Sequence, residues 1–238
     1  MATAISERLR TLTDDWAREL RRSPLFKLIA SAHLPPRALA FYLESMRQLI
    51  YYSERNLAVA GTRCRELEQL GLVDYFERKS IEENGHDRWS EADLARLPHA
   101  ATNALRPAAA IQALLELQQR AIATHPICFA AYVVWAEYMT AILGDESVAM
   151  LVACGYERSQ LTTLTKHTEA DREHSLRGFE ELAGLWRQQV DAEQVVETVR
   201  TACALFGGFC QEIWEQATMT DGVDPIVPEQ PVPSVARS

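Results

Sequence analysis

The segment KHTEADREH, residues 166–174, carries two histidines and an aspartate at helical spacing. Successive residues of an α-helix turn by about 100°, so these spacings place His167, Asp171 and His174 within an arc of about 60°. Leu164 extends the same stripe, which indicates that the stripe faces the protein interior. Two imidazoles and a carboxylate that face inward need a polar partner, and a divalent metal ion supplies one. The alternative is a solvated polar helix face.

A second set of candidate ligands lies earlier, in EENGH at residues 82–86. Glu83 and His86 are three residues apart, so one helix can present both to a single ion, as Glu-x-x-His motifs do in helical metal sites. Glu83 shares the apolar stripe of the preceding turns, whereas Glu82 points about 100° away, so Glu83 is the preferred ligand. Glycine inside a helix costs about 1 kcal/mol relative to alanine, so Gly85 indicates close backbone approach or room for a ligand. An exposed acidic turn is the alternative.

Two more glutamates lie on predicted helix faces. Glu137, in AAYVVWAEYMTAIL, shares its stripe with small apolar side chains. A carboxylate is costly to bury there unless it is paired or bound to metal. Glu54 lies near the apolar stripe of an earlier helix. For both residues the alternative is an ion pair with an arginine such as Arg47 or Arg55.

The candidate ligands combine imidazole and carboxylate groups from three or four helices. Such a donor set favours iron or manganese over structural zinc. Six or seven ligands are enough for two ions rather than one. The sequence therefore predicts a two-metal site formed by Glu54, Glu83, His86, Glu137, His167, Asp171 and His174.

The composition predicts a single all-α domain. The chain has 238 residues, of which 47% are hydrophobic, enough for a sizeable core. Segments with a period of about 3.6 fill the chain, without a convincing alternating strand pattern. Residues 1–218 are expected to form the domain, and the proline-rich residues 219–238 a disordered tail. The predicted helices span 4–21, 36–62, 66–95, 105–122, 126–143, 146–155, 160–186 and 192–218.

Charge and cysteine content exclude several classes of function. The net charge is −9, without a run of basic residues, which argues against nucleic acid and anionic membranes as partners. The absence of a long apolar run or an N-terminal apolar block predicts a cytoplasmic protein without a membrane-spanning helix. Five cysteines without CxxC spacing argue against a disulfide framework or a zinc–thiolate site.

Three segments in this order, EENGH, WAEY (135–138) and HTEADREH, resemble the haem-oxygenase-like di-metal oxidases. The resemblance covers residues 36–180 and implies one domain of about seven to eight helices. In that family one helix supplies Glu and His, the next Glu, and a later one His-x3-Asp-x2-His. The matching residues are Glu83 and His86, then Glu137, then His167, Asp171 and His174. A carboxylate from the first core helix is common as well, and Glu54 is the candidate, although its position matches less well.

The resemblance implies an O2-activating non-haem di-iron oxidase. Its cofactors would be two Fe2+ ions, with manganese as the other candidate metal, and O2 would be a co-substrate. Related enzymes N-oxygenate amines, cleave C–C bonds, desaturate or decarboxylate small amino-acid-like or aliphatic acids. The aromatic residues and arginines of this chain favour a small amino-acid-like substrate over a long acyl chain.

Three alternatives share the same fold. Haem oxygenases bind haem through a histidine of the first helix, but this chain has no histidine before His33. A thiaminase-type cysteine hydrolase would use Cys128 as its nucleophile. A metal-free small-molecule binding module would satisfy the polar groups by hydrogen bonds between them. Long helices of this kind often pair, which is compatible with a homodimer.

Overall fold

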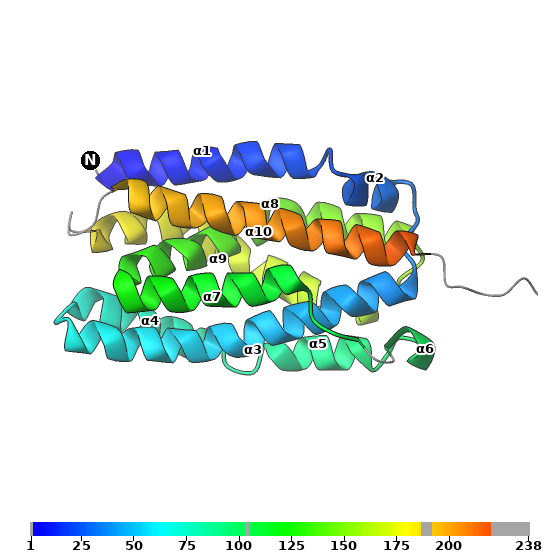
Figure 1. The fold of residues 1–238 in the computed structure, drawn as a ribbon, viewed down its shortest axis with the longest axis horizontal. Coiled ribbons are helices and arrows are strands. Elements are labelled where there is room, and N and C mark those ends of the chain that lie inside the picture. Colours follow the sequence, from blue (N-terminus) through cyan, green and yellow to red (C-terminus); the bar gives the residue numbers. More distant parts are fainter. Residues whose placement is uncertain (1, 103–104, 187–191, 220–238) are drawn as a thin grey trace, which may run out of the picture.

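The computed structural model describes residues 2–102, 105–186 and 192–219. These residues form helices and no β-strand, which confirms the all-α prediction. Figure 1 shows the long helices lying side by side along the long axis of one bundle. The helices are α1 (Ala2–Leu20), α2 (Pro24–Ala30), α3 (Pro36–Glu66), α4 (Leu70–Glu82), α5 (Asp87–Leu94), α6 (His99–Thr102), α7 (Ala109–Thr124), α8 (Pro126–Ala153), the short 3-10 helix η1 (Arg158–Gln160), α9 (Thr162–Leu185) and α10 (Ala192–Thr218).

Helix α8 is the central element of the bundle. It packs against α7, α9 and α10, and it also contacts α1 and α3. By length and composition α8 could cross a membrane, but 61% of its apolar window is buried inside the bundle. A helix that is apolar on all sides and surrounded by other helices is typical of a protein core. The cytoplasmic location stays a prediction.

Helix α8 differs from the sequence prediction of two helices, 126–143 and 146–155. Gly144 and Asp145 do not end a helix, because α8 continues to Ala153. A Cβ atom on Gly144 would lie 1.9 Å from Oγ1 of Thr168 in α9. Glycine at this position therefore allows α8 and α9 to approach closely and does not act as a stop signal.

The opposite correction applies to the predicted helix 66–95, which the structure divides into α4 and α5. Gly85 has a φ of +79°, a left-handed conformation that interrupts a right-handed helix. Glu83 caps the C-terminus of α4, and His86 is the N-cap residue of α5. The two predicted ligands thus lie on either side of a turn and not on one helix.

Shorter elements account for the remaining differences. The predicted helix ranges include neither α2, α6 nor η1. These short elements and the break after α4 add to the long helices of the predicted bundle. Residues 220–238 lie outside the described residues, so the disordered tail stays a prediction.

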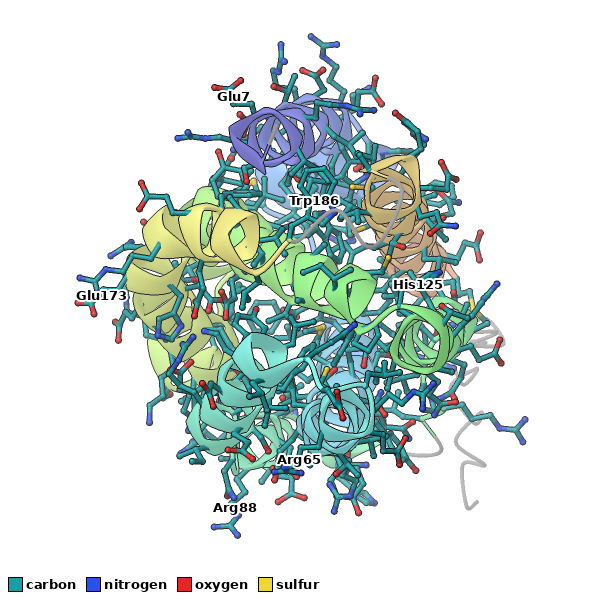
Figure 2. The ribbon with its side chains drawn as sticks, turned by 90° about the vertical axis from the view of Figure 1, so that its left-hand side faces the viewer. Glu7, Arg65, Arg88, His125, Glu173 and Trp186 are labelled. Atoms are coloured by element: carbon teal, nitrogen blue, oxygen red, sulfur yellow. The ribbon has the colours of Figure 1, made fainter. Side chains whose placement is uncertain are left out.

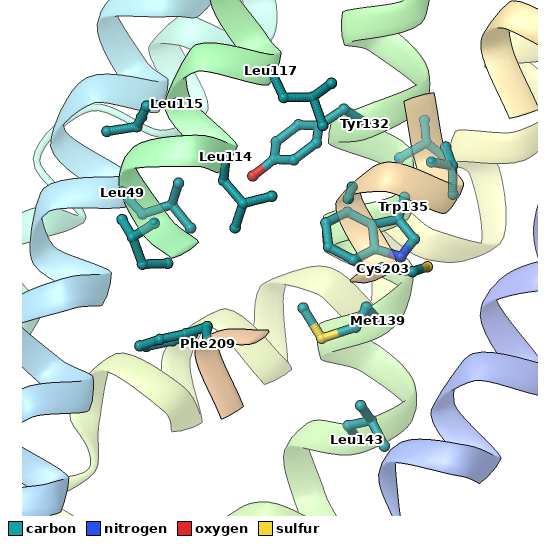
Figure 3. Packing of buried hydrophobic residues seen from close by; sticks show 14 of the residues in the cluster. Leu49, Leu114, Leu115, Leu117, Tyr132, Trp135, Met139, Leu143, Cys203 and Phe209 are labelled. Carbon is teal, nitrogen blue, oxygen red and sulfur yellow. The ribbon is translucent and has the colours of Figure 1, made fainter. Parts of the chain in front are cut away.

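The hydrophobic core lies inside the bundle, between the long helices. Figure 3 shows apolar side chains of α3, α7, α8 and α10 meeting there, among them Leu114, Trp135 and Phe209, which are almost completely buried. Charged side chains such as Arg65 and Glu173 point outward around the bundle, as Figure 2 shows in the view along the helices. This arrangement makes any charged group inside the bundle exceptional.

Candidate metal centre

Helices α8 and α9 run antiparallel and bring several predicted ligands to one interface. Facing pairs appear in opposite order along the two helices: Val134 with Gly178, Glu137 with His174, Thr140 with Asp171, and Gly144 with Thr168. Glycine at one member of each outer pair lets the helix backbones approach closely, so the inner pairs are held in register. Asp171 and His174 of α9 thereby face α8, whereas His167 lies against His86 and Trp89 at the start of α5.

The first set of donors, here called the helix group, consists of Glu137, Asp171 and His174. Their potential ligand atoms all lie within 4.8 Å of one another. Glu137 and Asp171 are buried, and Nδ1 of His174 makes no hydrogen bond with the described residues, whereas Oε1 of Glu137 lies 2.7 Å from Nζ of Lys79. Burial, with the nearby carboxylates of Glu137 and Glu83, raises the pKa of Asp171 to about 9. In the absence of a metal ion, a proton therefore neutralises this carboxylate.

The second set of donors, here called the turn group, consists of Glu83, His86 and His167. Their potential ligand atoms also lie within 4.8 Å of one another. Nδ1 of His86 lies 3.1 Å from Oε2 of Glu83 and can donate a hydrogen bond to it. Burial opposes the charge of Glu83, but this hydrogen bond and the imidazole of His167 lower its pKa overall. The ring of Trp89 stacks on the imidazole of His86, with 3.9 Å between the ring centroids.

A buried polar chain orients His167. Asp93 of α5 is fully buried and accepts hydrogen bonds from the backbone N–H and the hydroxyl of Thr163, at 2.7 and 2.8 Å. The carbonyl of Thr163 accepts a hydrogen bond from Nδ1 of His167 at 2.8 Å. This tautomer leaves Nε2 free for a metal ion. Burial also lowers the pKa of His167, which favours the neutral imidazole that binds metals.

The structure brings together six of the seven predicted ligands within these two groups. Glu54 is half-buried on α3 and belongs to neither group among the described residues. Its neighbours Ser53 and Leu57 line the cavity described below, whereas Glu54 does not. The rotation of α3 therefore directs other side chains toward the site.

Sequence reasoning missed Lys79, a buried lysine at the centre. Its Nζ lies 2.7 Å from Oε1 of Glu137 and 2.8 Å from Oε2 of Glu82, and its side chain is only 4% exposed. Burial opposes its charge, but the carboxylates of Glu137 and Glu82 together outweigh that effect and raise the pKa of Lys79. The available signal is its position four residues before Glu83, on the buried stripe of α4.

A cavity of about 230 Å³ borders both groups. Glu83, Glu137, His167 and Asp171 form its polar end. The rest of the wall is mainly aliphatic and aromatic, with no lysine or arginine from the part of the chain that the structure describes. Figure 3 shows part of this wall. The residues it labels that line the cavity are Leu49, Tyr132, Trp135, Met139 and Leu143.

The donor set fits divalent ions that take nitrogen and oxygen ligands. Each group offers three potential ligands, and in the helix group the buried Nδ1 of His174 makes no hydrogen bond with the described residues. Unsatisfied buried polar atoms are costly, and metal coordination would satisfy them. The absence of cysteine from both groups favours iron or manganese over structural zinc.

Cys128, the nucleophile of the alternative prediction, lies in a different environment. It is buried near the start of α8 and does not belong to the cavity wall. Burial raises the pKa of its thiol, and the contact with Thr198 only partly offsets this. Reactive cysteines have lowered pKa values, because the thiolate is the nucleophile. This environment favours an unreactive thiol.

Comparisons with known proteins identify the fold. No family model and no curated protein matches the chain. A solved structure from Shewanella denitrificans, described as a domain of unknown function with a heme oxygenase-like fold, is 18% identical with a TM-score of 0.76, and the match covers 91% of this chain and 93% of that one.

Two further solved structures are similar over nearly their whole length. A TenA homolog from Pseudomonas syringae is 14% identical with a TM-score of 0.72, covering 89% of this chain and 93% of that one. A CADD-like protein of unknown function from Nostoc punctiforme is 13% identical with a TM-score of 0.65, covering 88% and 98%. At these identities the likeness establishes the fold alone. The chain therefore has the haem-oxygenase-like fold, as the order of its EENGH, WAEY and HTEADREH segments predicts.

Proposed function

We propose that this chain is an O2-dependent non-haem di-iron oxidase that acts on a small aliphatic acid. The observation that carries the proposal is the pair of three-residue donor groups at the polar end of one cavity. Three carboxylates, from Glu83, Glu137 and Asp171, would offset three of the four positive charges of two Fe2+ ions. The same donors suit manganese, which is the second candidate metal.

Two bound iron ions would supply the electrons that reduce O2. The residues of the chain provide the surroundings for that chemistry. The carbonyl of Thr163 fixes His167 so that Nε2 faces the centre. The apolar wall excludes water and orients a substrate chain with one end at the ligand carboxylates.

The cavity wall supports an aliphatic acid rather than an amino-acid-like substrate. An amino acid carries an ammonium as well as a carboxylate. No lysine or arginine of the described wall could pair with its carboxylate. A fatty-acid-like molecule needs polar contacts only at one end, where the metal ions would bind its carboxylate. The cavity of about 230 Å³ leaves room for such a chain beside the polar end, and we expect a chain of medium length.

An anaerobic titration with Fe2+, followed by O2 uptake, tests this proposal. The protein should bind two ions per chain, and straight-chain acids from butanoate to tetradecanoate should stimulate O2 uptake most at medium length. The double variant His167→Ala/His174→Ala removes one ligand from each group and should abolish both responses. If the wild type binds no iron, the oxidase proposal is wrong. If iron binds and amino acids stimulate O2 uptake while fatty acids do not, only the substrate class is wrong.

Thiol alkylation separates the oxidase from the cysteine hydrolase, a candidate kept because a TenA homolog shares this fold. Since Cys128 is buried and its pKa is raised, iodoacetamide should leave iron binding and O2 uptake unchanged. Loss of thiamin-type hydrolysis in a Cys128→Ser variant, together with no iron binding, would instead support the hydrolase.

A further inference from the structure

The two donor groups differ in the cation that accompanies them. In the helix group, Oε1 of Glu137 lies 2.7 Å from Nζ of Lys79. In the turn group, the partner of Glu83 is the imidazole of His86, and no lysine or arginine of the described residues forms an ion pair with Glu83. Only one of the two candidate metal positions thus already holds a fixed positive charge.

The ammonium of Lys79 occupies the oxygen atom of Glu137 that a metal ion would also bind. A metal ion bound through Oε1 of Glu137 would lie about 2 Å from that oxygen, closer than the ammonium at 2.7 Å. Two cations on the same oxygen repel each other strongly inside a protein, where charges are poorly screened. The lysine head must therefore move for this oxygen to bind the ion.

Glu82 can keep an ion pair with the displaced ammonium of Lys79. Its Oε2 already lies 2.8 Å from Nζ of Lys79, and its side chain is 29% exposed. The flexible four-carbon stem of lysine allows the head to move toward Glu82 without becoming an unpaired buried charge, which would be costly. Lys79 is thus held between one candidate metal ligand and one carboxylate outside both groups.

We propose that Lys79 is the resident counter-cation of the helix group, which a metal ion must displace onto Glu82, so that the turn group fills first and the helix group second. This inference rests on the proposed two-metal function. It assigns Lys79 a role in the order and relative affinity of metal loading. Lys79 acts here as a positioning residue through Glu137, without touching the substrate.

Metal titrations of unreacted protein test this order. Anaerobic calorimetry with Fe2+ and spectroscopy with Mn2+, both without O2, report each binding step separately. Wild-type protein should bind one ion tightly and a second more weakly. Lys79→Met removes the charge with little change in volume. It should tighten the second step at least tenfold and change the first step much less, because Lys79 acts on Glu83 only at longer range. Lys79→Arg keeps the charge and should keep the weak second step.

Arg78→Met is the matched control. Arg78 precedes Lys79 on α4 and pairs with Glu82 and Glu181, but not with Glu137. This variant removes the same charge from the same helix, so it should leave both binding steps near their wild-type values. If Arg78→Met tightens the second step as much as Lys79→Met does, the effect is general electrostatics and the proposal is wrong.

Glu82→Gln provides a second variant in case Lys79→Met does not fold. Without the Glu82 carboxylate, displacement leaves the ammonium unpaired, so the second ion should bind at least several-fold more weakly. Equal second-step affinities in wild type, Lys79→Met and Glu82→Gln would overturn the role of Lys79 while keeping two-metal binding. A weaker second step in Lys79→Met would also overturn it. Absence of metal binding in every variant would overturn the two-metal function itself.

Discussion

The turn group and the helix group contain similar donors on different kinds of backbone. Glu83 and His86 of the turn group lie at helix ends, on either side of the left-handed Gly85. The three residues of the helix group lie inside α8 and α9, where the two helices are closely packed. The helix group is therefore positioned by rigid packing, and the turn group by a short connection and its hydrogen bonds.

The two groups also differ in the charge state of their carboxylates. The pKa of Glu83 in the turn group is lowered, whereas the pKa of Asp171 in the helix group is raised to about 9. The turn group thus has an ionised carboxylate ready for a cation. In the helix group, a proton neutralises Asp171 and the ammonium of Lys79 neutralises Glu137. Similar ligand sets can therefore differ in readiness for metal because of their surroundings.

The largest expected effect comes from removing one ligand from each group in turn. His167→Ala and His174→Ala should each reduce metal stoichiometry from two ions to about one. O2 uptake should fall by more than about 100-fold, since even residues that only support metal ligands contribute about 10- to 100-fold. Elemental analysis and an O2 electrode measure both effects. The exposed His33→Ala serves as control and should behave as wild type; two retained ions in both ligand variants would contradict the assignment.

The next prediction concerns the support of the turn group alone. Asp93→Ala removes the acceptor for the N–H and hydroxyl of Thr163, whose carbonyl orients His167. The affinity of the first binding step should fall about 10- to 100-fold, while the second step changes less. Anaerobic calorimetry measures both. Asp145→Asn, which alters an exposed carboxylate paired with Arg172, should change neither step.

Packing of the helix group is tested by Gly144→Ala. The new Cβ would lie 1.9 Å from Oγ1 and 2.8 Å from Cβ of Thr168, so α8 and α9 must separate. Overpacking of this kind should lower the free energy of unfolding by about 1–3 kcal/mol. Gly184→Ala on α9 meets no atom within 4 Å and should stabilise the protein by up to about 1 kcal/mol. Urea unfolding of both variants distinguishes a packing effect from a general effect of alanine.

The last prediction concerns a pH slope in metal-free protein. Because the pKa of Asp171 rises from its usual 3.8 to about 9, the folded state binds more protons than the unfolded state between these values. The contribution of Asp171 to stability therefore decreases as pH rises from about 4 to about 9. Glu83 has the opposite effect. Because its pKa is lowered in the folded state, its contribution to stability is present above the usual pKa of a glutamate and is lost as the pH falls.

Thermal melts of protein treated with a chelator measure this slope. Asp171→Asn should flatten it, because asparagine does not titrate. An unchanged slope in Asp171→Asn would show that other groups determine the pH dependence.

The sequence predicts the fold class and the α9 ligands because both depend on local periodicity. A rotation of about 100° per residue is enough to place His167, Asp171 and His174 on one face. The break between α4 and α5 also has a local signal, since the Asn84–Gly85 pair commonly ends a helix. The continuation of α8 through Gly144 has no such signal, because its reason is Thr168 on another helix.

Tertiary packing also explains why sequence reasoning missed Lys79 and Asp93, and why it does not decide the position of Glu54. A buried lysine is recognisable only when the carboxylates that surround it are known, and those of Lys79 come from α4 and α8. Asp93 acquires its role through Thr163, 70 residues later in the chain. Glu54 depends on the rotation of α3 about its own axis, which a broad apolar stripe does not fix.

Part of the cavity wall lies on helices that carry none of the grouped donors. Helices α2, α3 and α10 contribute side chains such as Phe26, Leu49 and Phe206 to the wall, but none of the six grouped donors. Substitutions on these three helices can thus reshape the space for a substrate while the donor atoms keep their places. Such a division makes the scaffold readily evolvable, and a mutational library confined to α2, α3 and α10 is the natural starting point for changing its substrate range.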